Sequence, residues 1–258
     1  MNKTLKDLVA GFRLYPVWLH QAYYVLGSKY KRTIFGTFWI AGQFVCLSLA
    51  FTFVFGMLFH REIKTFLPYA MLGNLSAFTC LTPIQDGPEL YMSNAGIIRN
   101  YAYPFTFFSF ELTARTLMQL GHNLVVFYVF MLFNQTLSIP NWTFIPGLLI
   151  DSVSILTWST VFGMLAARYR DLRYLLPSLT TPLFFLTPVY WPIENLGANR
   201  AIAEYNPLYS MVSVMRMPLL GEWPSALNWE MSTMIAVLGC VAWFVSFLLF
   251  RRRIPFWI

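Results

Sequence analysis

Long runs of apolar residues, separated by short polar connections, make up most of this chain. A helix needs about 20 mostly apolar residues to cross a bilayer, so each long run is a candidate membrane span. Six runs reach or approach this length, at residues 34–59, 66–85, 105–133, 142–167, 175–191 and 229–250. The fifth is the shortest and contains Pro177, Pro182 and Pro188, which predicts a bent helix. The pattern predicts an all-α membrane protein with six transmembrane helices.

The stretch at residues 186–221, which begins within the fifth run, is apolar but broken by four prolines. Irregular backbone at membrane depth is tolerated only where protein or a water-filled path surrounds it. We therefore expect re-entrant short helices between spans five and six, which dip into the bilayer and return to the same side. Asn206 followed by Pro207 predicts the start of one of them, because Asn caps helices and Pro favours their first turn.

A further helix is predicted ahead of the first span, over about residues 15–32. Its apolar side chains recur on one face, at Leu19, Ala22, Tyr23, Leu26 and Tyr30, and basic residues gather at its end. This pattern indicates an amphipathic helix in the membrane interface, with its cations near anionic headgroups. The alternative is a basic flank that only sets the topology. No apolar run follows the first lysines closely enough to predict a cleaved signal peptide.

The composition argues against a separate soluble domain. Hydrophobic residues make up 57% of the 258 residues and charged residues only 11%, against about 25% in soluble proteins. A separate soluble catalytic domain therefore has no room, and we expect one membrane domain over residues 1–258, with the six-span bundle at 34–251. Cys46, Cys80 and Cys240 lie singly within apolar runs, so we expect packing roles for them.

The distribution of Lys and Arg predicts the orientation in the membrane. With connections assigned to alternate sides, thirteen of the eighteen basic residues share the side of both termini and four lie opposite. Cytoplasmic connections collect Lys and Arg, so both termini should be cytoplasmic, and residues 186–221 should open at the outer face. The formal net charge of +7 then reflects topology, and no nucleic-acid partner is expected.

Charged groups within the predicted spans are few. Glu111 and Arg115 are spaced i,i+4, which predicts a mutual salt bridge. Asp151 has no cationic partner near it in sequence, so it is either a functional acid or a polar contact inside the bundle. The sequence has no Gly-Lys-Ser or Gly-Lys-Thr phosphate-binding loop, and its three histidines fit no metal motif. We expect no catalytic residue, metal or cofactor in this chain.

Five segments carry a resemblance to a known family: KYKRTIFGTFW at 29–39, NAGIIRNYAYP at 94–104, ARYRDLRYLLP at 167–177, LTPVYWP at 186–192 and YNPLYSMVSVMRMPLLG at 205–221. In this order they resemble the ABC-2 type permeases of polysaccharide exporters, over about residues 15–258. The resemblance implies a permease that moves a lipid-linked polysaccharide from the cytoplasm across the bacterial inner membrane. O-antigen is the favoured cargo, with capsule or teichoic acid as alternatives.

The resemblance also implies partners. The family works as a homodimer with two copies of an ABC ATPase subunit, so ATP and Mg would be bound by that subunit. Two cytoplasmic connections, at 93–104 and 168–174, would contact the ATPase through Asn94, Ile98, Arg99, Arg168, Arg170, Asp171 and Arg173. The alternative is that both connections are solvated turns that follow the charge rule. Membrane lipids and the lipid-linked glycan complete the expected partners.

Two sites are expected at the ends of the transport path. In the family, two short outer helices form a gate, here at about 195–205 and 207–220. The gate residues would be Glu194, Tyr205, Asn206, Pro207 and Arg216. On the cytoplasmic side, a diphosphate that joins lipid and sugar would meet a basic entrance, because compact cations complement phosphate. The entrance residues would be Lys29, Lys31, Arg32 and Arg99.

Aromatic residues are candidates for the path itself, because sugar rings stack on aromatic faces. A stripe recurs on one face of the first span, and more rings follow near the end of the fifth. The expected conduit residues are Phe44, Ser48, Phe51, Phe55, Phe184, Tyr190 and Trp191. The alternative is that these rings face lipid or pack against neighbouring helices. Two other functions stay open: an ABC-2 exporter of a smaller substrate such as a drug, and a membrane enzyme or scaffold of lipid-linked glycan assembly.

Overall fold

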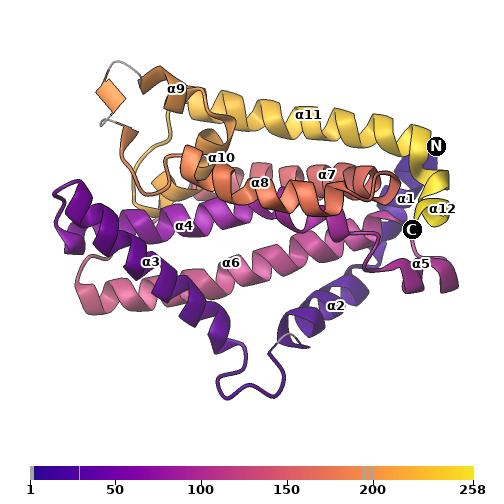
Figure 1. The fold of residues 1–258 in the computed structure, drawn as a ribbon, viewed down its shortest axis with the longest axis horizontal. Helices are drawn as coiled ribbons and strands as arrows, with labels where there is room; N and C mark the ends of the chain where they lie inside the picture. The colour runs from indigo at the N-terminus through magenta and orange to yellow at the C-terminus, as the bar shows by residue number, and fades with distance from the viewer. Residues whose placement is uncertain (1–2, 29, 194–195, 198–199) are drawn as a thin grey trace.

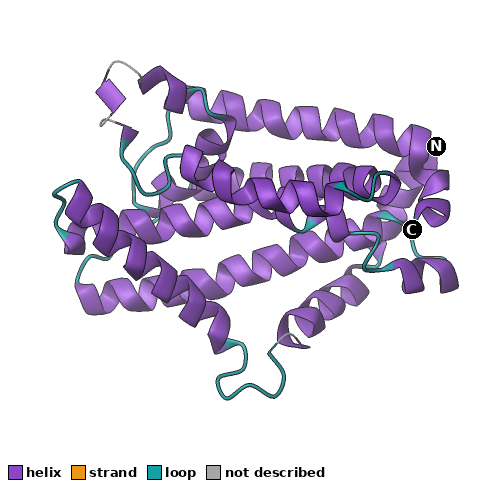
Figure 2. Cartoon of the chain, viewed as in Figure 1, coloured by secondary structure: helices purple, strands orange, loops and turns teal. Residues whose placement is uncertain are grey.

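The computed structural model describes residues 3–28, 30–193, 196–197 and 200–258. In this part of the chain every regular element is a helix, as Figure 2 shows, which confirms the all-α prediction. The helices are α1 (Lys3–Arg13), α2 (Tyr15–Ser28), α3 (Phe38–Leu58), α4 (Ile63–Gln85), α5 (Ala95–Asn100), α6 (Thr106–Asn134), α7 (Phe144–Arg168), α8 (Leu172–Leu186), α9 (Arg200–Glu204), α10 (Pro207–Leu219), α11 (Ala226–Phe250) and α12 (Ile254–Trp257). Two 3-10 turns, η1 (Gly87–Glu89) and η3 (Arg251–Arg253), complete the set.

The long helices lie side by side in one bundle, with both termini at the same end (Figure 1). We call this the terminal end; it also holds α1, α5 and α12. The opposite, distal end holds the α3–α4 turn and the segment with α9 and the start of α10. α7 lies centrally and packs against α4, α6, α10 and α11. This arrangement puts the two predicted cytoplasmic connections at one end and the predicted gate segment at the other.

Four helices are long and apolar enough to cross a membrane: α3, α6, α7 and the continuous helical stretch Ala226–Trp257. The chain is therefore a multi-pass membrane protein. The other two predicted spans differ from these. α4 has 23 residues but lies in the core, where it buries polar side chains, and α8 has only 15 residues. The count of six spans stays a prediction.

The bundle is polar inside and apolar outside at several positions, as expected for a protein surrounded by lipid. α11 turns Val237, Leu238 and Val241 outward and buries Asn228 and Ser232. Between other helices, Asn74 Nδ2 donates to Ser48 Oγ at 2.8 Å, and the hydroxyls of Ser109 and Thr160 lie 2.6 Å apart. Small polar groups that bond across helices are a common means of association in membranes.

α1 is an element that sequence reasoning missed. Its Asp7 is buried and accepts from the backbone N–H of Thr106 at 3.1 Å, so it caps α6 from outside that helix. Asp7 also forms an ion pair with Arg251 at 2.6 Å. A carboxylate at a helix N-terminus is favourable because it meets unpaired N–H groups and the positive end of the helix dipole. α1 thereby joins the start of α6 to the end of α11.

Candidate functional site

The two halves of the predicted aromatic conduit meet in space. The rings of Phe51 and Tyr190 stack with centroids 4.6 Å apart, and Phe55 stacks on the same tyrosine at 5.7 Å. Phe184 contacts Tyr190 edge-on at 5.6 Å. We call these four residues with Phe185 the aromatic cluster. It joins α3 to the end of α8, so residues more than 100 positions apart in sequence form one group.

The remaining conduit candidates are engaged in packing. Phe44 and Ser48 are buried, and Ser48 accepts the hydrogen bond from Asn74. Trp191 packs beside Ile193, and its indole N–H donates to the carbonyl oxygen of Phe185 at 3.2 Å. Within one chain the stripe is therefore a packed core. Its role in lining a path stays a prediction.

The predicted helix start at Asn206 and Pro207 is confirmed, whereas its gate role stays a prediction. α10 begins at Pro207, and Asn206 Oδ1 accepts from the backbone N–H of Leu208 at 3.0 Å, as a capping residue does. Within the range expected for the other helix, 195–205, the described residues contain α9 at Arg200–Glu204, followed by the exposed Tyr205, whereas residues 195 and 198–199 lie outside the described residues. Glu194 lies outside the described residues.

Arg216 of α10 is the largest side chain that is fully buried, with 1% of its surface exposed. Its Nη1 donates to the carbonyl oxygens of Pro188 and Val189, at 3.1 and 3.2 Å. The guanidinium also lies 4.1 Å from the ring centroid of Tyr69 on α4. Among the described residues no acid forms an ion pair with it. Through these two hydrogen bonds, Arg216 holds the turn at residues 188–189, which follows α8, against α10.

The same turn lies directly on α4. A Cβ added to Gly73 would come within 2.6 Å of the carbonyl oxygen of Val189, closer than real Cβ contacts allow. Gly147 of α7 meets the backbone of Val214 on α10 in the same way, at 2.5 Å. Glycine at these two positions allows α10 and the 188–189 turn to approach the central helices closely.

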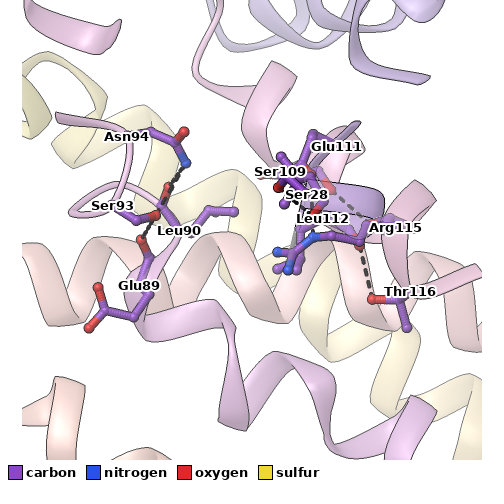
Figure 3. A network of polar contacts seen from close by, with 12 residues as sticks. Ser28, Glu89, Leu90, Ser93, Asn94, Ser109, Glu111, Leu112, Arg115 and Thr116 are labelled. Carbon is purple, nitrogen blue, oxygen red and sulfur yellow. Dashed lines mark hydrogen bonds and ion pairs between the residues drawn. The ribbon is translucent and has the colours of Figure 1, made fainter. Parts of the chain in front are cut away.

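At the terminal end, an ion pair joins the predicted docking connection at 168–174 to η1, the turn that precedes the other connection at 93–104. Arg173, at the start of α8, forms two hydrogen bonds with Glu89 of η1: Nε to Oε1 at 2.6 Å and Nη2 to Oε2 at 3.0 Å. Figure 3 shows Glu89 with Ser93 and Asn94 on the turn that follows η1. There, Asn94 Nδ2 donates to the carbonyl oxygen of Leu90 at 2.8 Å. The bidentate pair holds the two connections together.

The other docking candidates surround this ion pair. Arg168, Arg170 and Asp171 are exposed, and the Arg168 guanidinium lies 5.5 Å from the ring centroid of Trp257. Ile98 of α5 packs against the core cluster that contains Ile258. Arg99 donates to the carbonyl oxygen of Ile258. We call residues 89–99, 168–173 and 257–258 the terminal surface.

The four entrance cations do not all lie together. Lys31 and Arg32 are exposed in the turn between α2 and α3, where the Lys31 ammonium lies 4.2 Å from the ring centroid of Tyr24. Figure 1 shows this turn beside the bundle, away from α5, which carries Arg99. Lys29 lies outside the described residues. Arg99 thus belongs to the terminal surface, and the entrance role of Lys31 and Arg32 stays a prediction.

Comparison with protein families identifies the family to which this chain belongs. A family model described as "ABC-2 type transporter" matches residues 25–220, which include α3 to α10. The chain belongs to the ABC-2 type transporter family. It is therefore a transport subunit, and the stretch that the family model matches contains both of the predicted docking connections and the segment at 186–220.

Two curated relatives of this ABC-2 chain carry the same name. The chain is 21% identical to the O-antigen export system permease protein RfbA of Klebsiella pneumoniae over 233 residues, or 88% of each chain. It is also 21% identical to the protein of that name from Myxococcus xanthus over 194 residues, or 74% of each chain. The resemblance noted in the sequence is confirmed at the level of the family.

Polar groups inside the ABC-2 fold behave partly as expected. The predicted pair of Glu111 and Arg115 is present, with Oε1 and Nε 3.3 Å apart, and both residues are labelled in Figure 3. Asp151 is fully buried on α7, and the Cys80 thiol donates to it at 3.6 Å. A polar contact inside the bundle was one of the two roles left open for Asp151, and the structure favours it.

Sequence reasoning missed Glu89 as the ion-pair partner of Arg173. The cation-rich connection drew attention to Arg173, but its partner lies 84 positions earlier, beyond the reach of any helical spacing rule. The burial of Arg216 was also missed. One signal was available: a lone arginine in the apolar run SMVSVMRMPLL has to find polar partners nearby.

Proposed function

We propose that this chain is the permease subunit of an ATP-driven exporter that moves a lipid-linked polysaccharide from the cytoplasm across the bacterial inner membrane. One observation carries the proposal: family membership combined with similarity along 88% of the chain to a permease named for O-antigen export. O-antigen is accordingly the proposed cargo. The membrane-resident composition and the scarcity of charged residues agree with a transport role.

In the proposed exporter two copies of the chain form the path, and two ATPase subunits supply the energy. The terminal surface would receive the ATPases, since it carries exposed charges on two connections that Glu89 and Arg173 hold together. α8 starts at this ion pair and ends in the aromatic cluster. A displacement of the terminal surface would therefore be transmitted along α8 toward the 188–189 turn and Arg216.

Deletion of the gene tests the proposal. An exporter defect should leave full-length lipid-linked glycan on the cytoplasmic leaflet, where an impermeant glycosidase or lectin detects it only after the cells are opened. A complementing plasmid should clear this pool. Glycan that fails to lengthen in the deletion strain would instead indicate an assembly enzyme or scaffold and would refute the exporter.

The partnership has its own test. The purified chain alone should hydrolyse no ATP, because it has no phosphate-binding loop, whereas the complex with its ATPase should. Charge reversal at Arg170 or Asp171 should reduce co-purification of the ATPase, since both side chains are exposed on the terminal surface. Reversal at Glu222, which is exposed on the connection before α11, is the matched control and should leave the complex intact.

A further inference from the structure

A cavity of about 590 Å³ lies between α2, α3, α4 and α6, apart from the aromatic cluster and the terminal surface. This volume falls within the range of pockets that hold small-molecule ligands, about 300–1,000 Å³. One wall contains Phe78, whose ring is 5.5 Å from Phe184 of the aromatic cluster. The cavity therefore adjoins the candidate path.

The lining is unusually rich in carboxamides for the interior of a membrane bundle. Five of them come from three helices: Gln43, Asn74, Gln85, Gln119 and Asn123. The three glutamines are exposed, whereas the two asparagines are buried. The asparagine amides thus lie deeper in the cavity, and the glutamine amides lie nearer to solvent. Together they offer a ligand both hydrogen-bond donors and acceptors.

Two of these amides have hydrogen-bonding capacity that the protein leaves unused. The Oδ1 atoms of Asn74 and Asn123 are buried and have no hydrogen-bond partner among the described residues. Asn74 uses only its Nδ2, which donates to Ser48. Buried polar atoms are nearly always paired, so two such oxygens on one cavity point to a ligand or water that pairs with them.

The charge of the lining selects among polar ligands. Its charged side chains are Arg115 and Asp86, one of each sign. The Nε of Arg115 faces Glu111 Oε1 at 3.3 Å, so its charge is already compensated. A phosphate or diphosphate site needs an excess of cations, and the described residues of this lining carry none. A neutral ligand with many hydroxyl groups fits better, because carboxamides match hydroxyls and the rings of Phe44 and Phe78 offer faces for C–H groups.

We propose that this cavity binds sugar residues of the transported glycan, through the carboxamides of Asn74 and Asn123. The identity of the ligand rests on the proposed function. The proposed ligand is the neutral sugar part of the glycan and not the diphosphate.

The test measures protection of a cysteine at the mouth of the cavity. The complex with its ATPase is reconstituted in lipid nanodiscs with Cys46 and Cys240 replaced by alanine, since both are exposed. Gln119→Cys reports on the cavity, and Glu222→Cys, which does not line it, is the matched control. Maleimide labelling is followed with three probes: oligosaccharide released from the host's lipid-linked glycan, inorganic diphosphate, and added phosphatidylglycerol.

The oligosaccharide should slow labelling of Gln119→Cys at least about fivefold and leave Glu222→Cys unchanged, whereas diphosphate and phosphatidylglycerol should protect neither. Equal protection by diphosphate or lipid would overturn the assignment to sugar. The absence of protection by the oligosaccharide would also overturn it. A cysteine at 119 that maleimide does not label even before a probe is added would overturn it as well, because lipid or a second copy of the chain would then fill the cavity.

A second variant addresses affinity without loss of the fold. Asn123→Leu removes the unpaired carboxamide at similar volume and should raise the oligosaccharide concentration needed for half-protection about five- to tenfold. Gly121→Ala is its control on the same helix, because an added Cβ there meets nothing within 4 Å. Unchanged half-protection in Asn123→Leu would refute the contact. If the oligosaccharide does not protect Gln119→Cys while the deletion strain accumulates glycan, the cavity assignment is refuted and the exporter proposal is supported. If it protects Gln119→Cys while the deletion strain accumulates no glycan, only the exporter proposal is refuted.

Discussion

Replacing Arg173 by Gln removes the bidentate ion pair with Glu89 while keeping a polar side chain at the start of α8. The two side chains are 30% and 39% exposed, so solvent screens much of their attraction. Exposed pairs contribute about 0.2–1 kcal/mol, and the bidentate geometry places this one near the upper limit. A loss of about 1 kcal/mol corresponds to roughly a fivefold shift in the equilibrium between joined and separated connections.

The expected result is a loss of coupling and not of folding. In inverted vesicles that contain the complex, glycan export per ATP hydrolysed should fall by up to about fivefold in Arg173→Gln. ATP turnover should change less, because the catalytic site lies in the partner. Thermal unfolding should move by only a few degrees, in line with about 1 kcal/mol.

A double-mutant cycle isolates the pair. Glu89→Gln and Arg173→Gln should each reduce coupling, and the double variant should be no worse than either one. Arg252→Gln is the control, since it removes an exposed arginine charge at the same end of the bundle but outside the terminal surface. Additive effects in the double variant, or equal losses in the control, would refute a role for this pair in coupling.

Three further substitutions test the packing that the path depends on. Arg216→Met leaves the carbonyls of residues 188 and 189 unpaired, so the detergent-solubilised protein should lose about 1–3 kcal/mol in thermal unfolding, and no loss would contradict the contact. Gly73→Ala should lower export because its Cβ would strike the Val189 carbonyl, whereas Gly121→Ala should not, and equal export by both would contradict this. Asp7→Asn weakens the cap of α6 and the pair with Arg251; unfolding by heat should come earlier by about 2 kcal/mol, and an unchanged melting temperature would count against it.

The elements that the sequence predicts best are those whose signal is local. Apolar runs of span length became α3, α6, α7 and α11, and Asn206 with Pro207 started α10 as expected. Both signals depend on residues within a few turns of one another. The i,i+4 pair of Glu111 and Arg115 belongs to the same class.

Contacts between distant segments could not be read in this way. The rings of Phe51 and Tyr190 were chosen by residue type, but only the packing of α3 against the end of α8 brings them together. Arg99 was assigned to the entrance by its charge, yet the fold carries it to the C-terminal residue. α1 was not predicted, although its apolar residues Leu5, Leu8 and Phe12 recur at helical spacing; what the sequence could not show is that its Asp7 is buried and contacts Thr106 and Arg251.

In the proposed six-span arrangement, the shortness of α8 accounts for the polar character of several predicted gate residues. Fifteen residues rise about 22 Å, less than the hydrocarbon thickness of about 30 Å, so in that arrangement the chain continues at membrane depth without helical hydrogen bonds. Its freed carbonyls then need donors. Trp191 donates to the carbonyl of residue 185, Asn206 to that of 186, and Arg216 to those of 188 and 189. Each donor lies in or beside the proline-broken segment, so that segment satisfies the end of α8 and is held by the same bonds. In the proposed exporter, a motion that opens the segment would break these bonds, so we expect the end of α8 to be part of the gate.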